Sequence, residues 1–452
     1  MQEVVRKQRE YFYSGETLSV DFRLKQLKLL KESMSKHKDA LYKAFKLDYN
    51  KCEFDVVATE YSMVLTELDY MLKHLKRLAK AKKVTTEIVN FPSKGKVIPH
   101  PYGVVLIMSP WNYPFQLTMS PLVGAIAAGN TAVVKPSNYS KNVSNVINDI
   151  LGVFDDKYIK TVLGGREQNQ ALLDQEFDYI FFTGGETVGK LVMEKASRHL
   201  TPVSLELGGK SPCIIDETSD IDIAAKRVAW GKFLNAGQTC VAPDYVLVHK
   251  SIHDKFTQKL IEYIKSFYYV KGRLTDNFPW IINERHAQRI EGLIDQEKLI
   301  FGGKRIERLI EPTILDNCTY QDNVMQEEIF GPVLPILTFE SLDEVISDRH
   351  KLPKPLAFYI FSNSKDNINK LLTNCTFGGG CINDTVMHLT NANLPFGGVG
   401  ASGMGSYHGA KSFETFSHYK SVLVKGKMEV NIKYPPYTKE KLELVKKIMK
   451  VK

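Results

Sequence analysis

Residues 103–136 read GVVLIMSPWNYPFQLTMSPLVGAIAAGNTAVVKP, and this stretch decides the fold class. Two short apolar runs, residues 103–110 and 131–136, enclose an Ala- and Leu-rich segment that is long enough for a helix. A strand, a helix and a second strand in this order form a βαβ unit, whose two strands run parallel. We therefore expect a buried parallel sheet of the α/β class.

The same stretch carries no charged residue from Gly103 to Val134, so a hydropathy window would flag it as a membrane span. Five helix-breaking residues interrupt it, namely Pro110, Pro114, Pro121, Gly124 and Gly129. This pattern favours a buried α/β core over a span. Residues 1–10 are polar and charged and lack the apolar centre of a secretion signal, so we expect a cytoplasmic protein.

The alternation of apolar runs with helix-length segments continues along the chain. It includes YIKTVLGG (158–165) and YIFFTGG (179–185), and a second series begins near Pro212 with CIIDE (213–217), YVLVHK (245–250), PVLPILTFE (332–340) and PLAFYIF (355–361). The 452 residues exceed the roughly 250–300 at which a single core stops growing. Two α/β domains in series are the simplest interpretation.

The N-terminal part follows a different pattern. Residues 25–47 and 54–80 carry apolar side chains at three- and four-residue steps, which predicts packing helices. Residues 85–99, TTEIVNFPSKGKVIP, favour strands around a Pro-Ser-Lys-Gly turn and predict an extended hairpin. Such an arm often reaches another subunit.

Composition argues against several classes of protein. The 60 basic and 51 acidic residues are spread through the chain, and a net charge of +9 without a basic stripe argues against a nucleic-acid partner. The cysteines form no CxxC pair and have no histidines at zinc spacing, so we expect neither a metal site nor a disulfide framework. They are Cys52, Cys213, Cys240, Cys318, Cys375 and Cys381.

Ligands of open α/β sheets bind beyond the carboxyl ends of the strands, so we examined those ends for chemistry. The run from Tyr179 to Gly189 places Gly184, Gly185 and Gly189 where a strand turns into a helix. Backbone without side chains can approach a phosphate there, at the helix N-terminus. The run is not the GxGxxG fingerprint, and an ordinary glycine turn fits it equally well.

Two further strand ends carry Asn112 and Lys135. The Asn112 amide could donate to a developing oxyanion, and Lys135 could anchor a ribose or a phosphate. Taken alone, however, each pattern favours a purely structural alternative: a turn-forming asparagine before a Pro-rich bend, and a lysine that faces solvent.

Cys240 and Glu206 are the candidate nucleophile and base. Cys240 lies in NAGQTCVAP (235–243), a loop of small residues that would leave a thiol accessible, although composition alone favours a buried structural cysteine. Glu206 lies in LELGGK (205–210), where burial between leucines would raise its pKa towards that of a useful base. The alternative for Glu206 is an exposed carboxylate on an edge strand.

Seven motifs join these fragments: WNYP (111–114), KPS (135–137), FTGG (182–185), LELGGK (205–210), GQTC (237–240), EEIFGPV (327–333) and PFGG (395–398). In this order the chain resembles the aldehyde dehydrogenase superfamily over nearly its whole length. The short N-terminus, CVAPDYVLV (240–248), PLAFYIFS (355–362) and SGMGSYHGAKSFETFSH (402–418) resemble the class 3 branch, which includes oxidisers of fatty, aromatic and polyene aldehydes.

The resemblance implies the architecture of that superfamily. A Rossmann-like cofactor domain would span residues 1–84 and 100–207, and a second α/β catalytic domain would span residues 208–401. Residues 85–99 and 418–430 would form the β-hairpin arm that joins a homodimer, and residues 431–452 would be a basic C-terminal tail. The tail contains lysines and apolar residues in a helix-compatible pattern, which allows at most a weak peripheral membrane contact.

The resemblance also implies residue roles. Cys240 would attack the aldehyde, Asn112 and the Cys240 N–H would hold the oxyanion, hydride would pass to the nicotinamide, and Glu206 would activate the water that hydrolyses the thioester. NAD and/or NADP would be held by Lys135, Ser137, Asn138, Gly184, Gly185, Gly189, Glu328 and Phe330. The substrate pocket would be lined by Tyr113, Leu117, Trp230, Thr239, His388 and Phe396.

Two positions depart from the family pattern. Asn138 stands where a glutamate commonly binds the adenosine ribose, and the missing charge removes repulsion against a 2′-phosphate, so we expect NADP to be accepted as well as NAD. Gly185 replaces a small polar residue, which puts any side-chain contact there in doubt. Two alternatives stay open: a CoA-acylating relative, which typically lacks a base such as Glu206, and a catalytically silent structural member.

Overall fold

The predicted βαβ unit forms the centre of a six-stranded sheet with the strand order β19-β7-β6-β3-β4-β5. All neighbouring strands are parallel except β19, which runs antiparallel to β7. The strands are β3 (Val104–Met108), β4 (Thr131–Lys135), β5 (Ile159–Thr161), β6 (Tyr179–Thr183), β7 (Val203–Glu206) and β19 (Gly403–Met404). The computed structural model describes residues 1–451.

The uncharged stretch is explained by burial. Every residue of β3 and β4 is buried, as expected for parallel strands that are covered on both faces. Every residue of α6 (Gln116–Ala128) between them is also buried, and the helix ends at Gly129, whose φ of 98° is a left-handed cap. The other helices of this unit are α1 (Gln2–Tyr13), α2 (Val20–Lys36), α3 (Lys38–Tyr49), α4 (Glu53–Val56), α5 (Ser62–Leu78), α7 (Lys141–Leu151), α8 (Arg166–Leu173) and α9 (Glu186–Ser197).

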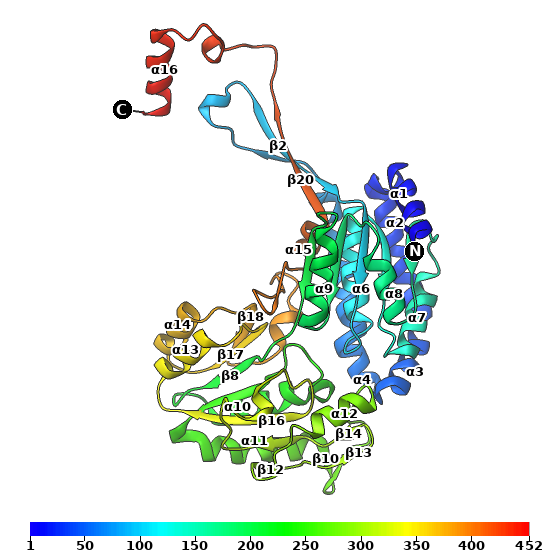
Figure 1. Cartoon of the computed structure of the whole chain (residues 1–452), viewed down its shortest axis with the longest axis vertical. Coiled ribbons are helices and arrows are strands. Elements are labelled where there is room, and N and C mark those ends of the chain that lie inside the picture. Colours follow the sequence, from blue (N-terminus) through cyan, green and yellow to red (C-terminus); the bar gives the residue numbers. More distant parts are fainter. Residues whose placement is uncertain (452) are drawn as a thin grey trace.

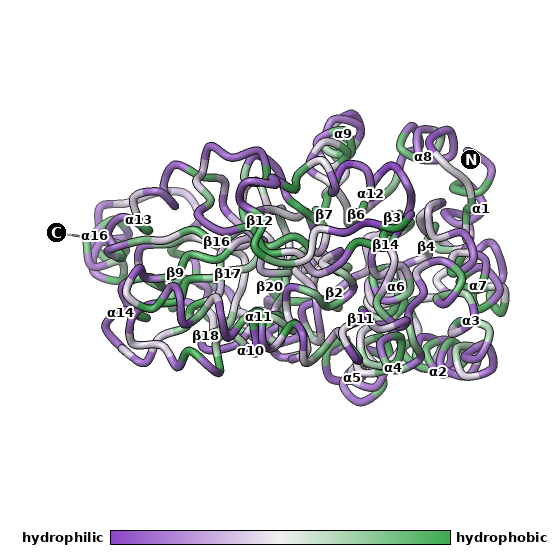
Figure 2. Tube along the Cα trace, turned by 90° about the horizontal axis from the view of Figure 1, so that it is seen from below, coloured by the Kyte–Doolittle hydropathy of each residue, from purple (hydrophilic) through white to green (hydrophobic). Residues whose placement is uncertain are grey.

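A second, seven-stranded sheet has the order β12-β15-β16-β9-β8-β17-β18, parallel throughout except for β12. Its strands are β8 (Pro212–Ile215), β9 (Tyr245–His249), β12 (Leu299–Phe301), β15 (Thr313–Leu315), β16 (Val333–Phe339), β17 (Ala357–Phe361) and β18 (Gly379–Ile382). Its helices are α10 (Ile221–Phe233), α11 (His253–Tyr268), α12 (Glu284–Glu291), α13 (Leu342–Lys351) and α14 (Lys365–Asn374). Apolar residues follow the strands, whereas the outer helices alternate between apolar and polar faces (Figure 2).

Two small hairpins complete this part of the chain. The hairpins are β10 (Tyr269–Val270) with β11 (Arg273–Leu274), and β13 (Arg305–Ile306) with β14 (Leu309–Ile310). The short helix α15 (Ala410–Thr415) belongs to the first unit, where it contacts α6. The two sheets confirm the predicted α/β class, and strands are present at all eight apolar runs on which the prediction rested.

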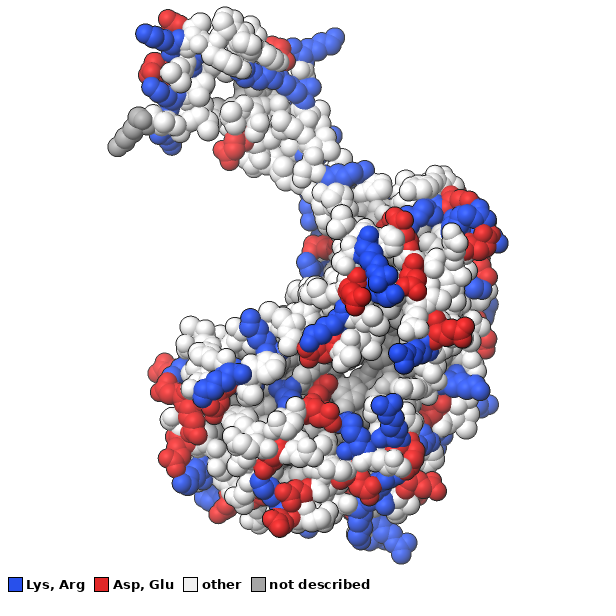
Figure 3. Space-filling view, viewed as in Figure 1, with Lys and Arg blue, Asp and Glu red and all other residues white. Residues whose placement is uncertain are grey.

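A three-stranded antiparallel sheet projects from this body (Figure 1). It consists of β1 (Lys82–Val84), β2 (Lys94–Pro101) and β20 (Ser417–Val424), with β2 in the middle. The final helix α16 (Lys439–Met449) stands clear of the body with lysines around it (Figure 3). Among residues 1–451, none of the helices combines the length and the apolar character that crossing a bilayer requires.

The predicted helix over residues 25–47 is wrong in its continuity. His37, with φ −99° and ψ 9°, ends α2 and precedes α3, so two helices share the apolar pattern. The segment predicted over residues 54–80 divides into α4, a π-helical turn η2 (Val57–Tyr61) and α5. Periodicity did not reveal these breaks because the apolar face continues across them.

Candidate active site

The predicted functional residues lie where strands of the first sheet end. Asn112 follows β3, Lys135 is the last residue of β4, and Glu206 is the last residue of β7. The carboxyl ends of parallel strands share one edge, which is where ligands of open α/β sheets bind. The N–H of Gly184, just after β6, donates to the Glu206 carbonyl over 3.0 Å. The candidate base and the glycine turn are therefore direct neighbours.

Cys240 comes from the second unit, in the turn between α10 and β9. Asn235 in this turn has a φ of 53°, a left-handed conformation that few side chains adopt. Its side-chain amide donates to the carbonyl of Gln238 over 3.1 Å and to the carbonyl of Asn112 over 2.9 Å. One side chain therefore stabilises the cysteine loop and joins it to the Asn112 loop.

Glu206 is buried, whereas Cys240 and Glu328 are partly exposed. Burial raises the pKa of the Cys240 thiol to about 12, and the negative charges of Glu328 and Glu206 add to that shift. Burial raises the pKa of Glu206 well above its usual value, and neither carboxylate oxygen has a hydrogen-bond partner among residues 1–451. Burial and the charge of Asp244 raise the pKa of Glu328 to about 8. Both carboxyls are therefore suited to taking up protons.

The turn after β6 has room for a phosphate. Gly185 is the N-cap of α9, and a Cβ placed on it would meet no atom within 4 Å. Gly189, one turn into the helix, lies so close to Leu207 that a Cβ would come within 2.8 Å of its side chain. The glycines thus bring a helix N-terminus against the sheet edge and leave the space in front of it open, which suits a pyrophosphate.

The Lys135–Asn138 segment lies at the same edge of the sheet. Lys135 is buried rather than solvent-facing, its ammonium donates to the Pro136 carbonyl over 2.8 Å, and burial lowers its pKa to about 8. Ser137 is partly exposed and its hydroxyl accepts from the Tyr139 N–H over 3.2 Å, whereas Asn138 is exposed. A buried ammonium and polar side chains at a strand end fit the ribose of a dinucleotide.

The candidate substrate residues form two groups. The Tyr113 hydroxyl and the Thr239 Oγ1 lie 2.7 Å apart, beside Cys240. The rings of His388 and Phe396 lie 6.1 Å apart, and burial lowers the pKa of His388 to about 4. Leu117 is buried on α6 and Trp230 is 36% exposed on α10.

Comparison with known proteins decides the family. The model of the aldehyde dehydrogenase family matches residues 1–422 of the chain. The chain belongs to this family.

Relatives and solved structures agree with that assignment. The chain is 46% identical over 446 residues to a 4,4'-diaponeurosporen-aldehyde dehydrogenase of Staphylococcus aureus, covering 97% of each protein. It is 44% identical over 448 residues to aldehyde dehydrogenase family 3 member A2 of Rattus norvegicus, covering 98% of this chain and 93% of the relative. The solved substrate-bound state of Staphylococcus aureus AldH matches with a TM-score of 0.97 and 45% identity, covering 99% of each chain.

The protein is therefore an aldehyde dehydrogenase, an enzyme that oxidises an aldehyde with NAD and/or NADP. Both cofactors occur among its relatives: a rat dimeric NADP-preferring aldehyde dehydrogenase is 43% identical over 440 residues, covering 96% of this chain and 97% of the relative. A Staphylococcus aureus betaine aldehyde dehydrogenase solved with NAD+ is 27% identical, with a TM-score of 0.84, and covers 96% of this chain and 91% of that one. The predictions of family, class 3 likeness and cofactor are confirmed.

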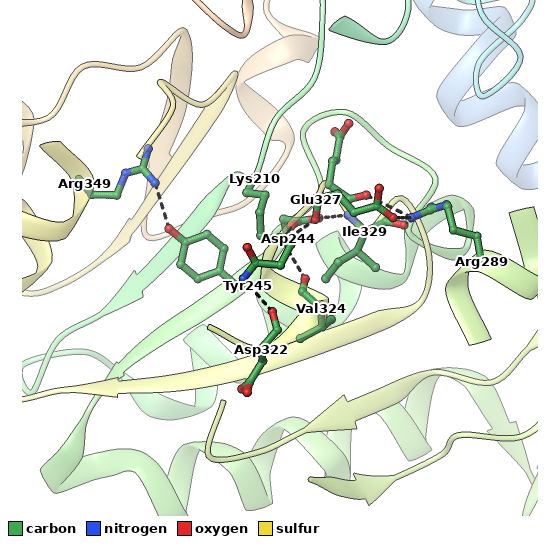
Figure 4. A network of polar contacts seen from close by, with 11 residues as sticks. Lys210, Asp244, Tyr245, Arg289, Asp322, Val324, Glu327, Ile329 and Arg349 are labelled. Atoms are coloured by element: carbon green, nitrogen blue, oxygen red, sulfur yellow. Dashed lines mark hydrogen bonds and ion pairs between the residues drawn. The ribbon is translucent and has the colours of Figure 1, made fainter. Parts of the chain in front are cut away.

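In this aldehyde dehydrogenase a polar network holds the segment that precedes Phe330 (Figure 4). The Lys210 ammonium donates to Asp244 Oδ2 over 2.5 Å and to the Glu327 carbonyl over 2.9 Å. Asp244 Oδ1 accepts from the Ile329 N–H over 3.0 Å. Arg289 donates to the Glu327 carboxylate over 2.8 Å and to the Ile329 carbonyl over 2.5 Å. The two neighbours of Glu328, Glu327 and Ile329, are therefore both held by hydrogen bonds.

The Lys210–Asp244 pair connects three functional segments. Lys210 lies four positions after Glu206, and Asp244 lies four positions after Cys240. Both contact the segment that carries Glu328: Lys210 through the Glu327 carbonyl and Asp244 through the Ile329 N–H. Neither residue was assigned a role from the sequence alone. The sequence offered one sign of their importance: Lys210 ends the LELGGK motif, and Asp244 lies four positions after the GQTC motif.

Replacing Asp244 by alanine removes the acceptor for Lys210 and for the Ile329 N–H. We expect Asp244→Ala to lower the free energy of unfolding by about 3 kcal/mol, because it leaves one member of a mostly buried pair without its partner. Cofactor affinity should fall as well, because the Glu328 segment loses an anchor. Denaturant unfolding and fluorescence titration with NAD measure the two effects.

Glu340→Ala is the matched control, because Glu340 pairs with Lys250 over 2.7 Å on the exposed surface. It should leave the midpoint of denaturant unfolding almost unchanged, because an exposed ion pair contributes little to stability. Equal effects from the two variants would contradict a special role for Asp244.

Proposed function

We propose that Cys240 oxidises the aldehyde through a covalent thioester that Glu206 helps to hydrolyse. The main support for this proposal is the contact between the unit of the six-stranded sheet and the unit of the seven-stranded sheet. The Asn235 amide holds the Asn112 loop against the cysteine loop, and Cys240 and Glu206 lie close enough for the charge of one to shift the pKa of the other. This meeting of nucleophile, oxyanion donor and base is the arrangement that acyl chemistry needs.

In the first half of the reaction the Cys240 thiol gives up its proton to solvent, and the sulfur, as thiolate, adds to the aldehyde carbon. The oxygen becomes an oxyanion, which the Asn112 amide and the Cys240 N–H stabilise by donating to it. Bound NAD or NADP supplies the hydride acceptor that turns this adduct into a thioester. Lys135, Ser137, Asn138 and the glycine turn would hold the adenosine and pyrophosphate parts, and Glu328 and Phe330 the nicotinamide end.

In the second half Glu206 takes a proton from a water molecule. The hydroxide oxygen attacks the thioester carbon, the carbon–sulfur bond breaks, and the carboxylate leaves while Cys240 is restored. The raised pKa of Glu206 makes it a stronger base than an exposed carboxylate, and its unpartnered oxygens are free to accept from water. This favours water over CoA as the acyl acceptor.

Two substitutions separate the two halves. Cys240→Ala should abolish NADH formation while cofactor binding persists, and Glu206→Gln should keep a first-turnover burst but slow steady-state turnover by at least about 100-fold. Because Glu206 acts only when ionised and its pKa is raised, hydrolysis should speed up as pH rises through that pKa. Stopped-flow absorbance of NADH records both phases.

Glu194→Gln, an exposed change on α9, is the control and should leave both phases unchanged. Full activity of Cys240→Ala would refute the nucleophile. A requirement for CoA in the assay would favour a CoA-acylating aldehyde dehydrogenase. Failure of the native protein to reduce NAD or NADP with any aldehyde would favour a catalytically silent structural member of the family.

We propose that Asn138 lets the enzyme accept NADP. It is exposed at the end of the β4 segment and carries no charge that would repel a 2′-phosphate. Asn138→Glu should lower kcat/KM for NADP by about tenfold or more while NAD turnover is kept, because one unfavourable charge contact of about 1.4 kcal/mol is worth that factor. Initial rates with each cofactor at saturating aldehyde test this, with Asn138→Gln as the uncharged control. No turnover of native enzyme with NADP would contradict the proposal.

We propose an apolar aldehyde as substrate: a medium or long aliphatic, an aromatic or a polyene aldehyde. The support is the buried Tyr113, Leu117 and Phe396, together with a relative that is named for diaponeurosporen-aldehyde. Along a series of straight-chain aldehydes, kcat/KM should rise by up to about fourfold per methylene group, as expected for burial worth about 0.8 kcal/mol. Equal values from acetaldehyde upward would contradict an apolar pocket.

We propose that the enzyme is a cytoplasmic homodimer joined through the projecting sheet. The supporting features are the exposed apolar side chains Val422, Leu423 and Val424 on β20, and a relative whose name describes it as dimeric. All six cysteines are free thiols, as is usual in a reducing compartment. The exposed lysines and apolar residues of α16 allow at most weak peripheral contact with a membrane.

A further inference from the structure

Behind the Asn112 loop lie two buried opposite charges that the mechanism above does not use. Lys51 is 2% exposed and Glu60 is fully buried. The Lys51 ammonium lies 3.5 Å from Glu60 Oε1. Burial raises the pKa of Glu60 to about 7 and lowers the pKa of Lys51, although each charge opposes the shift of the other. Such a pair contributes little to net stability, because desolvation offsets the attraction.

Glu60 contacts the C-terminal side of the loop. It belongs to the π-helical turn η2, and its Oε2 accepts from the N–H of Gln116, the first residue of α6, over 2.8 Å. Turns of this kind are rare and frequently lie at functional sites. A carboxylate at the start of α6 satisfies an N–H that has no partner within the helix and favours the helix dipole.

Lys51 contacts the middle of the loop. Its ammonium lies 4.6 Å from the centre of the Tyr113 ring, and the rings of Phe45 and Tyr49 lie 5.3 and 5.4 Å away. The Tyr113 hydroxyl lies 2.7 Å from Thr239 Oγ1, and Thr239 precedes Cys240. The Lys51 ammonium therefore contacts both Glu60 and the ring of Tyr113, whose hydroxyl hydrogen-bonds to the cysteine loop.

The N-terminal side of the loop is held by the same cluster. The Tyr49 hydroxyl, whose ring flanks Lys51, donates to the carbonyl of Trp111. Contacts to Trp111, Tyr113 and Gln116 thus surround Asn112 on both sides. They add to the bond from the Asn235 amide to the Asn112 carbonyl. Because a shift of about 1 Å in an oxyanion donor is enough to slow the reaction, these contacts bear directly on the chemistry.

We propose that Lys51 and Glu60 form a positioning pair that sets the place of the Asn112 amide relative to Cys240, with the Tyr113 ring as one of the contacts through which the pair acts. The inference rests on the proposed role of Asn112 as oxyanion donor. The pair touches no substrate and acts through residues 111–116. Its effect on the reaction should therefore depend on the presence of the Asn112 amide.

A double-mutant cycle tests this dependence. Lys51→Met keeps the length of the side chain and removes its charge, and it should lower kcat/KM for the aldehyde by at least about tenfold, as expected for a displaced catalytic group. Asn112→Ala alone should lower kcat/KM by about 100-fold, as loss of one oxyanion donor does elsewhere. In the Asn112→Ala background, Lys51→Met should lower it by less than about twofold further, because coupled residues are not additive.

Glu60→Gln enters the same cycle, and so does the double variant Lys51→Met/Glu60→Gln, which leaves no buried charge unpaired and is therefore the most secure to fold. Thermal unfolding of each variant accompanies the rates. The control is Lys31→Met, because Lys31 pairs with Asp69 over 2.5 Å on the exposed faces of α2 and α5. It should change kcat/KM by less than about twofold in both backgrounds.

The positioning pair is supported if the Lys51 and Glu60 substitutions lower kcat/KM strongly when Asn112 is present and have almost no effect in the Asn112→Ala background. An equal loss in both backgrounds would show a general structural effect and overturn it, as would native kcat/KM in the Lys51 and Glu60 variants. If Asn112→Ala keeps native activity while Cys240→Ala has none, the assignment of Asn112 has failed and the inference falls with it.

Discussion

Desolvation of the space around Cys240 governs the rest of this site. The thiol, Glu206 and Glu328 all have pKa values raised by burial, so none of them carries its charge as easily as it would in water. In such surroundings each polar group needs a partner or has a chemical use. Both Asp244 oxygens and the Asn235 amide nitrogen have partners, whereas neither Glu206 oxygen has one among the described residues.

The same constraint explains how two separately folded sheets share one site. A buried junction admits little water, so polar groups there need specific partners. Asn235 of the second unit donates to the Asn112 carbonyl of the first unit. Lys210 and Asp244 add a second connection, between the segments that carry Glu206 and Glu328.

Some predictions could be made from local pattern because their cause is local. The βαβ unit of residues 103–136 was predictable because strands buried on both faces must be apolar throughout. The seven ordered motifs predicted the family because each is confined to a few consecutive residues. The break at His37 was missed, since a helix end inside a continuous apolar face changes backbone angles without changing composition.

The α/β class and the family could be read from the amino-acid sequence alone, and the reactive residues were predicted from it. Only the tertiary structure decided that Lys135 is buried, that Glu206 lacks partners, and that Lys51 faces both Glu60 and Tyr113. The physical reason is distance along the chain. Burial and charge pairing depend on segments that fold together from far apart, such as Lys51 and Tyr113, and no window of consecutive residues contains both partners.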